Sequence, residues 1–212
     1  MRLWTTILLL FVSFAAQSQL KIEEKSKQYV IKSTSDIRGF VTENHIDYAL
    51  ISWCTSAWTS INSSIYGLFQ QQGNWYIAKI TTGIPTRKDT PFAKFAFTIN
   101  QHRLNKAEVD SVLRLLNPAQ AFKYKQEDFN KLPETYEYPE KNGEIVQIIQ
   151  PSDGATCHLL QLSNNEIKTL SFDNPDIYLK DFYPHFEGYG ILKGFVNTIR
   201  QLYTLTKDLP KE

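Results

Sequence analysis

Hydrophobic and polar residues alternate along several short segments of this chain, with the period of two that is typical of β-strands. In the first half these segments are residues 27–33, 45–54, 64–71, 75–82 and 94–99. Gly73-Asn74 separates the third segment from the fourth and predicts a hairpin there. Residues 81–91 carry prolines, a glycine and charged residues, so we expect an exposed loop before the last of these strands.

Apolar residues recur with a helical period at two places in the chain. Asn105 and Glu108 have the spacing of a capping box and predict a helix over residues 105–116, which Asn117-Pro118 should end. Its apolar stripe is Val109, Val112, Leu113 and Leu116. A second helix is predicted over about residues 189–207, with its buried stripe at Leu192, Phe195, Ile199 and Leu202.

The second half repeats the order of strands followed by a helix. Strands are predicted at residues 144–150, 156–162 and 167–172, and Asn164-Asn165 predicts a tight hairpin between the last two. A short helix is expected near residues 126–132, and one helical turn after Pro175. The pattern predicts an α+β fold in which one or more antiparallel sheets are packed by two main helices. We expect residues 19–212 to form one domain. Residues 117–143 are rich in proline and polar residues, so a division of this domain into two halves would fall there.

The amino terminus has the three parts of a signal peptide. Arg2 is basic, residues 7–16 are apolar apart from Ser13, and Ala16-Gln17-Ser18 offers small residues to a signal peptidase. The apolar run is too short to span a membrane, and no cysteine follows it to carry a lipid. We expect residues 1–18 to be removed and the protein to be exported to the periplasm or the cell exterior, the alternative being an uncleaved anchor.

Loss of Arg2 leaves equal numbers of basic and acidic residues in the mature chain. A nucleic-acid-binding protein would carry a basic excess, and an interfacial helix would carry clustered Lys and Arg. The composition therefore argues against nucleic-acid partners and against membrane insertion after processing.

Cys54 and Cys157 are the only cysteines. In an oxidising compartment two thiols of one chain often pair, so a disulfide is expected, with buried free thiols and a catalytic or metal-binding thiol as alternatives. Neither cysteine has a neighbour at zinc-ligand spacing, and the histidines share no such spacing. No metal or cofactor is expected.

Aromatic residues gather in the segment that runs from Trp53 to Tyr76. The members that we consider for ligand binding are Trp53, Trp58, Tyr66, Trp75 and Tyr76. Amides of the same segment, such as Asn62 and Gln70, could bond to sugar hydroxyls while the rings pack on a sugar face. The alternative is that these rings fill the core between sheet and helix.

His45 and Asp47 form the one local pair that could support general base catalysis, since residues two apart on a strand share a face. No nucleophile elbow, zinc-protease motif or glycine-rich phosphate loop accompanies them. A hydrolase-like enzyme is therefore the third reading of this sequence. A catalytic role is less expected than a non-catalytic one.

Residues 152–203 carry a hairpin, then Asn174, Pro175 and Tyr178 in an N-P-x-x-Y turn, then the closing helix. In this quarter the chain resembles uncharacterised exported proteins of Bacteroidetes bacteria. The resemblance implies a bacterial envelope setting and no particular activity. We therefore expect an exported, soluble, non-enzymatic envelope or interaction domain. The alternative is a small binding module for a glycan or apolar ligand, and an envelope protein is the third kind of partner considered.

Overall fold

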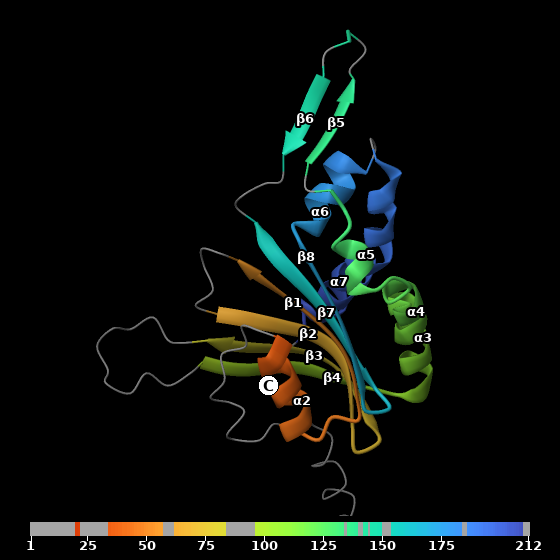
Figure 1. The fold of residues 1–212 in the computed structure, drawn as a ribbon. Coiled ribbons are helices and arrows are strands. Elements are labelled where there is room, and N and C mark those ends of the chain that lie inside the picture. Colours follow the sequence, from red (N-terminus) through yellow and green to blue (C-terminus); the bar gives the residue numbers. More distant parts are fainter. Residues whose placement is uncertain are drawn as a thin grey trace, which may run out of the picture.

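A computed structural model describes residues 20–21, 34–56, 62–83, 96–133, 135–139, 142–143, 145–149, 154–183 and 186–209. The fold is α+β, as predicted, and is built on a six-stranded antiparallel sheet in the order β4-β3-β2-β1-β7-β8 (Figure 1). The strands are β1 (Tyr48–Ser56), β2 (Asn62–Gln71), β3 (Asn74–Gly83), β4 (Ala96–Leu104), β7 (Ala155–Ser163) and β8 (Glu166–Asp173). A separate hairpin of β5 (Thr135–Pro139) and β6 (Ile145–Ile149) projects from this body (Figure 1).

Both halves of the sequence contribute to the same sheet. The antiparallel partners of β1 are β2 from the first half and β7 from the second, with Ser52 opposite both Tyr66 and Leu159. The seam predicted at residues 117–143 contains α4 (Pro118–Ala121), α5 (Gln126–Phe129) and β5. These short elements lie outside the main sheet, which continues on the far side of β1 with β7 and β8.

The two faces of the sheet are covered by different helices, and we name each face after its main helix. On β1, Ala49, Ile51 and Trp53 belong to the core of the α2 face, together with Ile37 and Phe40 of α2 (Thr34–Glu43). Leu50 belongs to the core of the α7 face, which α7 (Leu192–Thr206) and α3 (Lys106–Leu116) cover. The period of two in the strand sequences thus divides the apolar residues between two cores.

Helix α3 begins and ends where its sequence predicts. The Asn105 side chain accepts a hydrogen bond of 3.0 Å from the Glu108 N–H, and the Glu108 carboxylate accepts one of 2.7 Å from the Asn105 N–H. Asn117 ends the helix in the left-handed conformation, with φ at 44°. The capping box and the stop signal are therefore both confirmed.

Helix α7 crosses α4 closely because residue 194 is glycine. A Cβ on Gly194 would lie 2.5 Å from the Gln120 carbonyl oxygen, which is closer than real contacts allow. The Thr198 hydroxyl then donates to the Leu116 carbonyl oxygen at 2.8 Å, in a buried position. A short 3-10 helix, η3 (Glu187–Ile191), precedes α7, so the predicted start of this helix at residue 189 was slightly early.

The structure differs from the sequence prediction in two further places. Helix α2 was not predicted, although it covers one face of the sheet. The strand predicted from residue 45 begins at Tyr48, because His45 lies in the turn after α2 with φ at 50°. The strand predicted at residues 27–33 lies outside the described residues.

Candidate functional site

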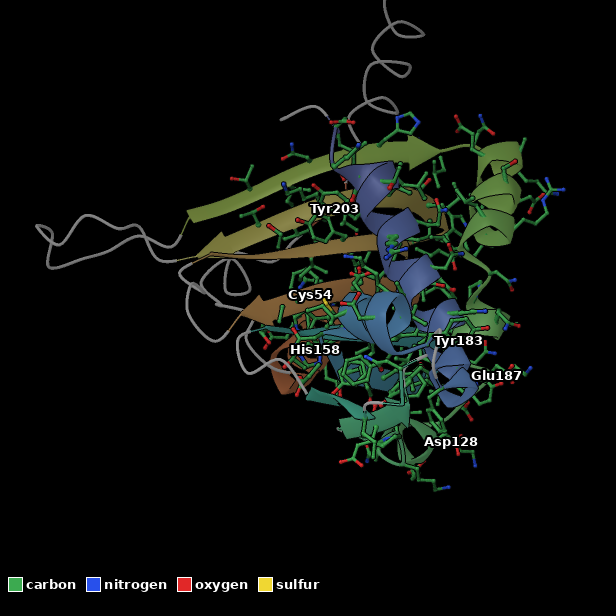
Figure 2. All side chains as sticks on the ribbon, turned by 90° about the horizontal axis from the view of Figure 1, so that it is seen from above. Cys54, Asp128, His158, Tyr183, Glu187 and Tyr203 are labelled. Atoms are coloured by element: carbon green, nitrogen blue, oxygen red, sulfur yellow. A yellow bond between two sulfur atoms is a disulfide. The ribbon has the colours of Figure 1, made fainter. Side chains whose placement is uncertain are left out.

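Cys54 and Cys157 form a disulfide, so the pairing expected from the sequence is confirmed and the free-thiol and metal-thiol alternatives are wrong. The two residues are direct cross-strand partners on β1 and β7, with their Cα atoms 4.1 Å apart (Figure 2). Cys157 is buried on the α7 face, whereas Cys54 is exposed. The bond fastens the two halves of the chain where they meet in the sheet.

The aromatic residues predicted to share one binding surface are divided between the two faces of the sheet. Trp53 and Tyr76 are buried in the core of the α2 face, while Tyr66 and Trp75 pack on the α7 face. Trp58 lies outside the described residues. The prediction of one surface was therefore wrong for the four described rings, because residues of opposite parity on a strand face opposite ways.

Trp53 is an interior residue with a specific neighbour. Its side chain is only 1% exposed, and its ring is stacked on His158 with the centroids 4.7 Å apart and the planes 15° from parallel. Burial lowers the pKa of His158, and the nearby Asp173 carboxylate partly opposes this shift. The Asp173 carboxylate itself accepts a hydrogen bond from the Thr156 hydroxyl.

The pair of His45 and Asp47 does not form the predicted unit. His45 is exposed, and the Asp47 carboxylate accepts a hydrogen bond of 2.9 Å from the backbone N–H of Gln72 in the β2–β3 turn. Within the part of the chain that is described, no hydrogen bond joins His45 to Asp47, and no group of three or more His, Cys, Asp or Glu side chains is placed to hold a metal ion.

A cleft of about 240 Å³ lies between α5 and the edge strand β8. Its apolar wall comprises Phe129, Leu132, Pro133, Phe172 and Tyr178. Its polar lining comprises Gln126, Asn130, Thr156, Ser171 and Asp173. Figure 2 labels Asp128 on α5, the element that forms one side of the cleft. Apolar walls with a few convergent polar groups are the usual character of a ligand site.

The Gln126 side chain joins the two sides of this cleft. Its amide oxygen accepts from the Ser171 N–H at 2.8 Å, and its amide nitrogen donates to the Ser171 carbonyl oxygen at 3.0 Å. The same nitrogen donates to the Asn130 amide oxygen at 2.8 Å. Because β8 has a neighbouring strand on one side only, Gln126 takes the place of a second neighbour for Ser171.

The rim at Pro133 is held from the other direction. The buried Tyr189 hydroxyl donates to the Pro133 carbonyl oxygen, and burial raises the pKa of Tyr189 to about 12. Beneath the cleft, Phe172 contacts Phe129 and Tyr178 edge to face, with centroid distances of 6.0 and 5.1 Å. The walls are thus fixed by hydrogen bonds and ring packing before any ligand arrives.

The sequence predicted the elements of this cleft without bringing them together. A short helix near residues 126–132 and a strand at 167–172 were expected, but their pairing depends on the order of strands in the sheet. The local signal was the i, i+4 amide pair of Gln126 and Asn130, which is a common surface pattern of helices.

A second hollow of about 270 Å³ lies at the tip of the β7–β8 hairpin and is lined by Gln161, Ser163, Asn164, Glu166 and Lys168. Its lining side chains are all polar or charged, whereas the cleft beside α5 also has aromatic and aliphatic side chains, so that cleft is the better candidate for a binding site. Among the described residues no helix has the length and apolar character needed to cross a membrane. No protein-family model, curated protein or solved structure matches this chain.

Proposed function

We propose that this chain is an exported, non-catalytic envelope domain that works by binding a small ligand, and that the cleft between α5 and β8 is the binding site. The observation that carries the proposal is one preformed hollow that is lined both by polar residues, among them Gln126 and Asn130, and by apolar residues, among them Leu132 and Phe172. The predicted Trp53–Tyr76 surface no longer supplies the site, so the binding alternative now rests on the cleft.

Export is supported by the amino-terminal pattern of residues 1–18 and by the disulfide. A disulfide with one exposed cysteine persists in oxidising compartments, whereas cytosolic reductants keep such thiols reduced. The test is to express the full chain in a bacterial host and alkylate free thiols in intact cells before lysis. We expect an amino terminus at Gln19 and unmodified Cys54 and Cys157. A chain that retains residues 1–18 and carries two alkylated cysteines contradicts export.

Binding is tested on the folded mature chain by two-dimensional ¹H–¹⁵N NMR. The probes are mixtures of neutral sugars, amino acids and carboxylic acids, and the readout is the shift of the backbone amides of Ser171 and Asp173. We expect one mixture to move these signals. Asn130→Tyr should abolish the effect by placing a ring over the exposed rim, while Asn197→Tyr on the exposed side of α7 should not. Unmoved signals with every mixture, or equal behaviour of both variants, contradict the proposal.

A protein partner is the second candidate, and Ile145 favours it. This residue lies on the projecting β5–β6 hairpin and is 70% exposed. Isolated two-stranded hairpins are only marginally stable in water, so a partner that covered this one would stabilise it. A photo-crosslinking amino acid at position 145 in living cells should then give one discrete envelope adduct. This candidate is ruled out if position 145 gives no adduct, or if it gives the same result as a crosslinker at the exposed control position 197.

A further inference from the structure

The α7 face of the sheet is open at one end of the strands β2 and β3. Helix α7 crosses this face over β1, β2 and β3, and the ends of these strands extend beyond it (Figure 2). On the extending part the side chains of Ser64, Lys79 and Thr81 are half-buried, whereas Ile80, on the opposite face, is fully buried. The sheet therefore presents side chains to solvent beside α7.

Five side chains of this region contact one another. The Tyr66 ring meets the ring of Tyr203 from α7 edge to face, with the centroids 5.3 Å apart (Figure 2). Lys79, the partner of Tyr66 on β3, places its Nζ 5.7 Å from the centre of the Tyr66 ring. Two residues further along the strands, the hydroxyl oxygens of Ser64 and Thr81 are 3.1 Å apart and form a hydrogen bond. The strand register places these residues on one face, and we call the five of them the Lys79 cluster.

The ammonium group of Lys79 has no anionic partner in the part of the chain that the structure describes. None of the ion pairs between described residues includes it. The strands β1, β2, β3 and β4 and the helix α7 contain no Asp or Glu, so the elements around the cluster supply no carboxylate. A half-buried cation loses hydration that only an anion or several acceptors can replace. The charge of the cluster therefore favours a ligand that carries a negative group.

The other members of the Lys79 cluster favour a ligand that also has a ring and hydroxyls. The Tyr203 side chain is 49% exposed, so its ring can pack against the C–H face of a sugar. Ser64 and Thr81 share one hydrogen bond, so one hydroxyl proton remains to be donated and both oxygens can still accept. Inorganic phosphate would leave the Tyr203 ring unused, and a fatty acid would cover the two hydroxyls without bonding to them.

We propose that the Lys79 cluster binds an acidic sugar unit of a polysaccharide, whose negative group is a carboxylate or a sulfate ester. The negative group lies against Lys79, the sugar ring packs on Tyr203, and the sugar hydroxyls bond to Ser64 and Thr81. One charge per ring suffices, because the cluster holds one cation. A single ring of about a dozen non-hydrogen atoms should bind with a Kd on the order of 1 mM. This surface lies on different elements from the cleft beside α5, so the inference does not depend on that cleft.

The test is an NMR titration of the ¹⁵N-labelled mature chain that follows the backbone amides of Tyr66 and Lys79. The probes are tetragalacturonate, a sulfated galactan tetrasaccharide, neutral galactotetraose and hexaglutamate, each added separately. We expect the acidic sugars to move these signals at concentrations at which the neutral sugar does not, and to bind more weakly as the ionic strength is raised. The tighter of the two acidic sugars identifies the negative group as a carboxylate or a sulfate ester.

Two variants test the assigned roles against a matched control. Lys79→Met removes the charge and keeps a side chain of similar length, so it should weaken binding of the acidic sugar by about tenfold. Tyr203→Ser removes the exposed ring and should weaken binding by about fivefold. Lys168→Met removes an exposed lysine from the edge strand β8 and should leave the Kd unchanged. The comparison of acidic and neutral sugars on the wild type does not depend on the folding of any variant.

The inference is wrong if galactotetraose binds as tightly as the acidic sugars, or if Lys79→Met and Lys168→Met bind them equally well. Tighter binding of hexaglutamate than of either acidic sugar would identify an acidic peptide as the partner and would also overturn the inference. The cleft is read from the amides of Ser171 and Asp173, so these outcomes leave the proposed function intact. Conversely, signals that move at Tyr66 and Lys79 alone would support this site and not the cleft.

Discussion

Removing the disulfide between Cys54 and Cys157 is predicted to lower the free energy of unfolding by about 4–5 kcal/mol. The two cysteines are 103 residues apart in sequence, so the bond closes a long loop in the unfolded chain. In the chain-entropy account, a loop of about 100 residues contributes roughly 4.7 kcal/mol at 25 °C. The folded state should change little, because β1 and β7 remain paired from Ala49 to Ser56 without the bond.

Urea unfolding followed by circular dichroism measures this difference on the mature chain. The comparison is between the oxidised wild type, the same protein reduced, and the variant with Cys54→Ser and Cys157→Ala. Alanine is chosen at the buried position because it adds no polar group to the core. We also expect a larger dependence of the unfolding free energy on urea without the bond, since the uncrosslinked chain exposes more surface when it unfolds.

The single variant Cys54→Ser is the internal control. It removes the crosslink while leaving the buried Cys157 thiol in place, so it should lose nearly the full amount. The reasoning is refuted if the reduced protein and both variants unfold within about 1 kcal/mol of the oxidised wild type. It is also refuted if their NMR spectra show that β1 and β7 have separated, because the effect would then lie in the folded state.

Three further predictions follow from buried polar groups. Gln71→Ala should lower the free energy of unfolding by about 2–3 kcal/mol in urea titrations, since the buried Gln71 amide bonds to both backbone groups of Lys21 and donates to the Asn44 carbonyl oxygen; Gln71→Glu should lower it at least as much, because its carboxylate would face two carbonyl oxygens. Burial raises the pKa of Tyr189 to about 12, so the unfolded chain loses this proton first and stability should fall by up to about 3 kcal/mol between pH 10 and 12; Tyr189→Phe should lose that pH dependence. Burial lowers the pKa of His158, so the unfolded chain takes up this proton first and stability should decrease as the pH falls below about 6.5. Asp173→Asn should lower that pKa further in an NMR titration, and a rise would contradict the assignment.

The local features of the fold could be predicted because neighbours in sequence determine them. The capping box depends only on the residue types at Asn105 and Glu108, which are three positions apart. The positive φ of Asn164 and Asn165 is a conformation that asparagine adopts more readily than most residues. Helix α2 was missed because its apolar residues, Ile37, Phe40 and Val41, are few. Its burial comes from the sheet face it covers, which a local window of sequence does not contain.

The candidate site depended on information that the sequence pattern lacks. Aromatic residues close in sequence, such as Trp53 and Tyr66, face opposite sides of the sheet, so proximity along the chain did not produce a shared surface. Gln126 and Ser171, by contrast, are 45 residues apart and meet only because β8 is the last strand. Period and spacing identify which elements form, but strand order decides which side chains converge.

The position of the cleft follows from how the edge of this sheet is closed. An edge strand presents backbone groups to solvent, and a full neighbouring strand would satisfy them without leaving a hollow. Here a four-residue helix and one glutamine side chain cover the end of β8. So short a cover satisfies Ser171 but cannot fill the space above Phe172, which leaves an apolar wall beside polar groups that are already fixed. A ligand would therefore meet a preformed site, and Asn130→Tyr at its exposed rim should change its affinity while leaving the free energy of unfolding within about 1 kcal/mol of the wild type.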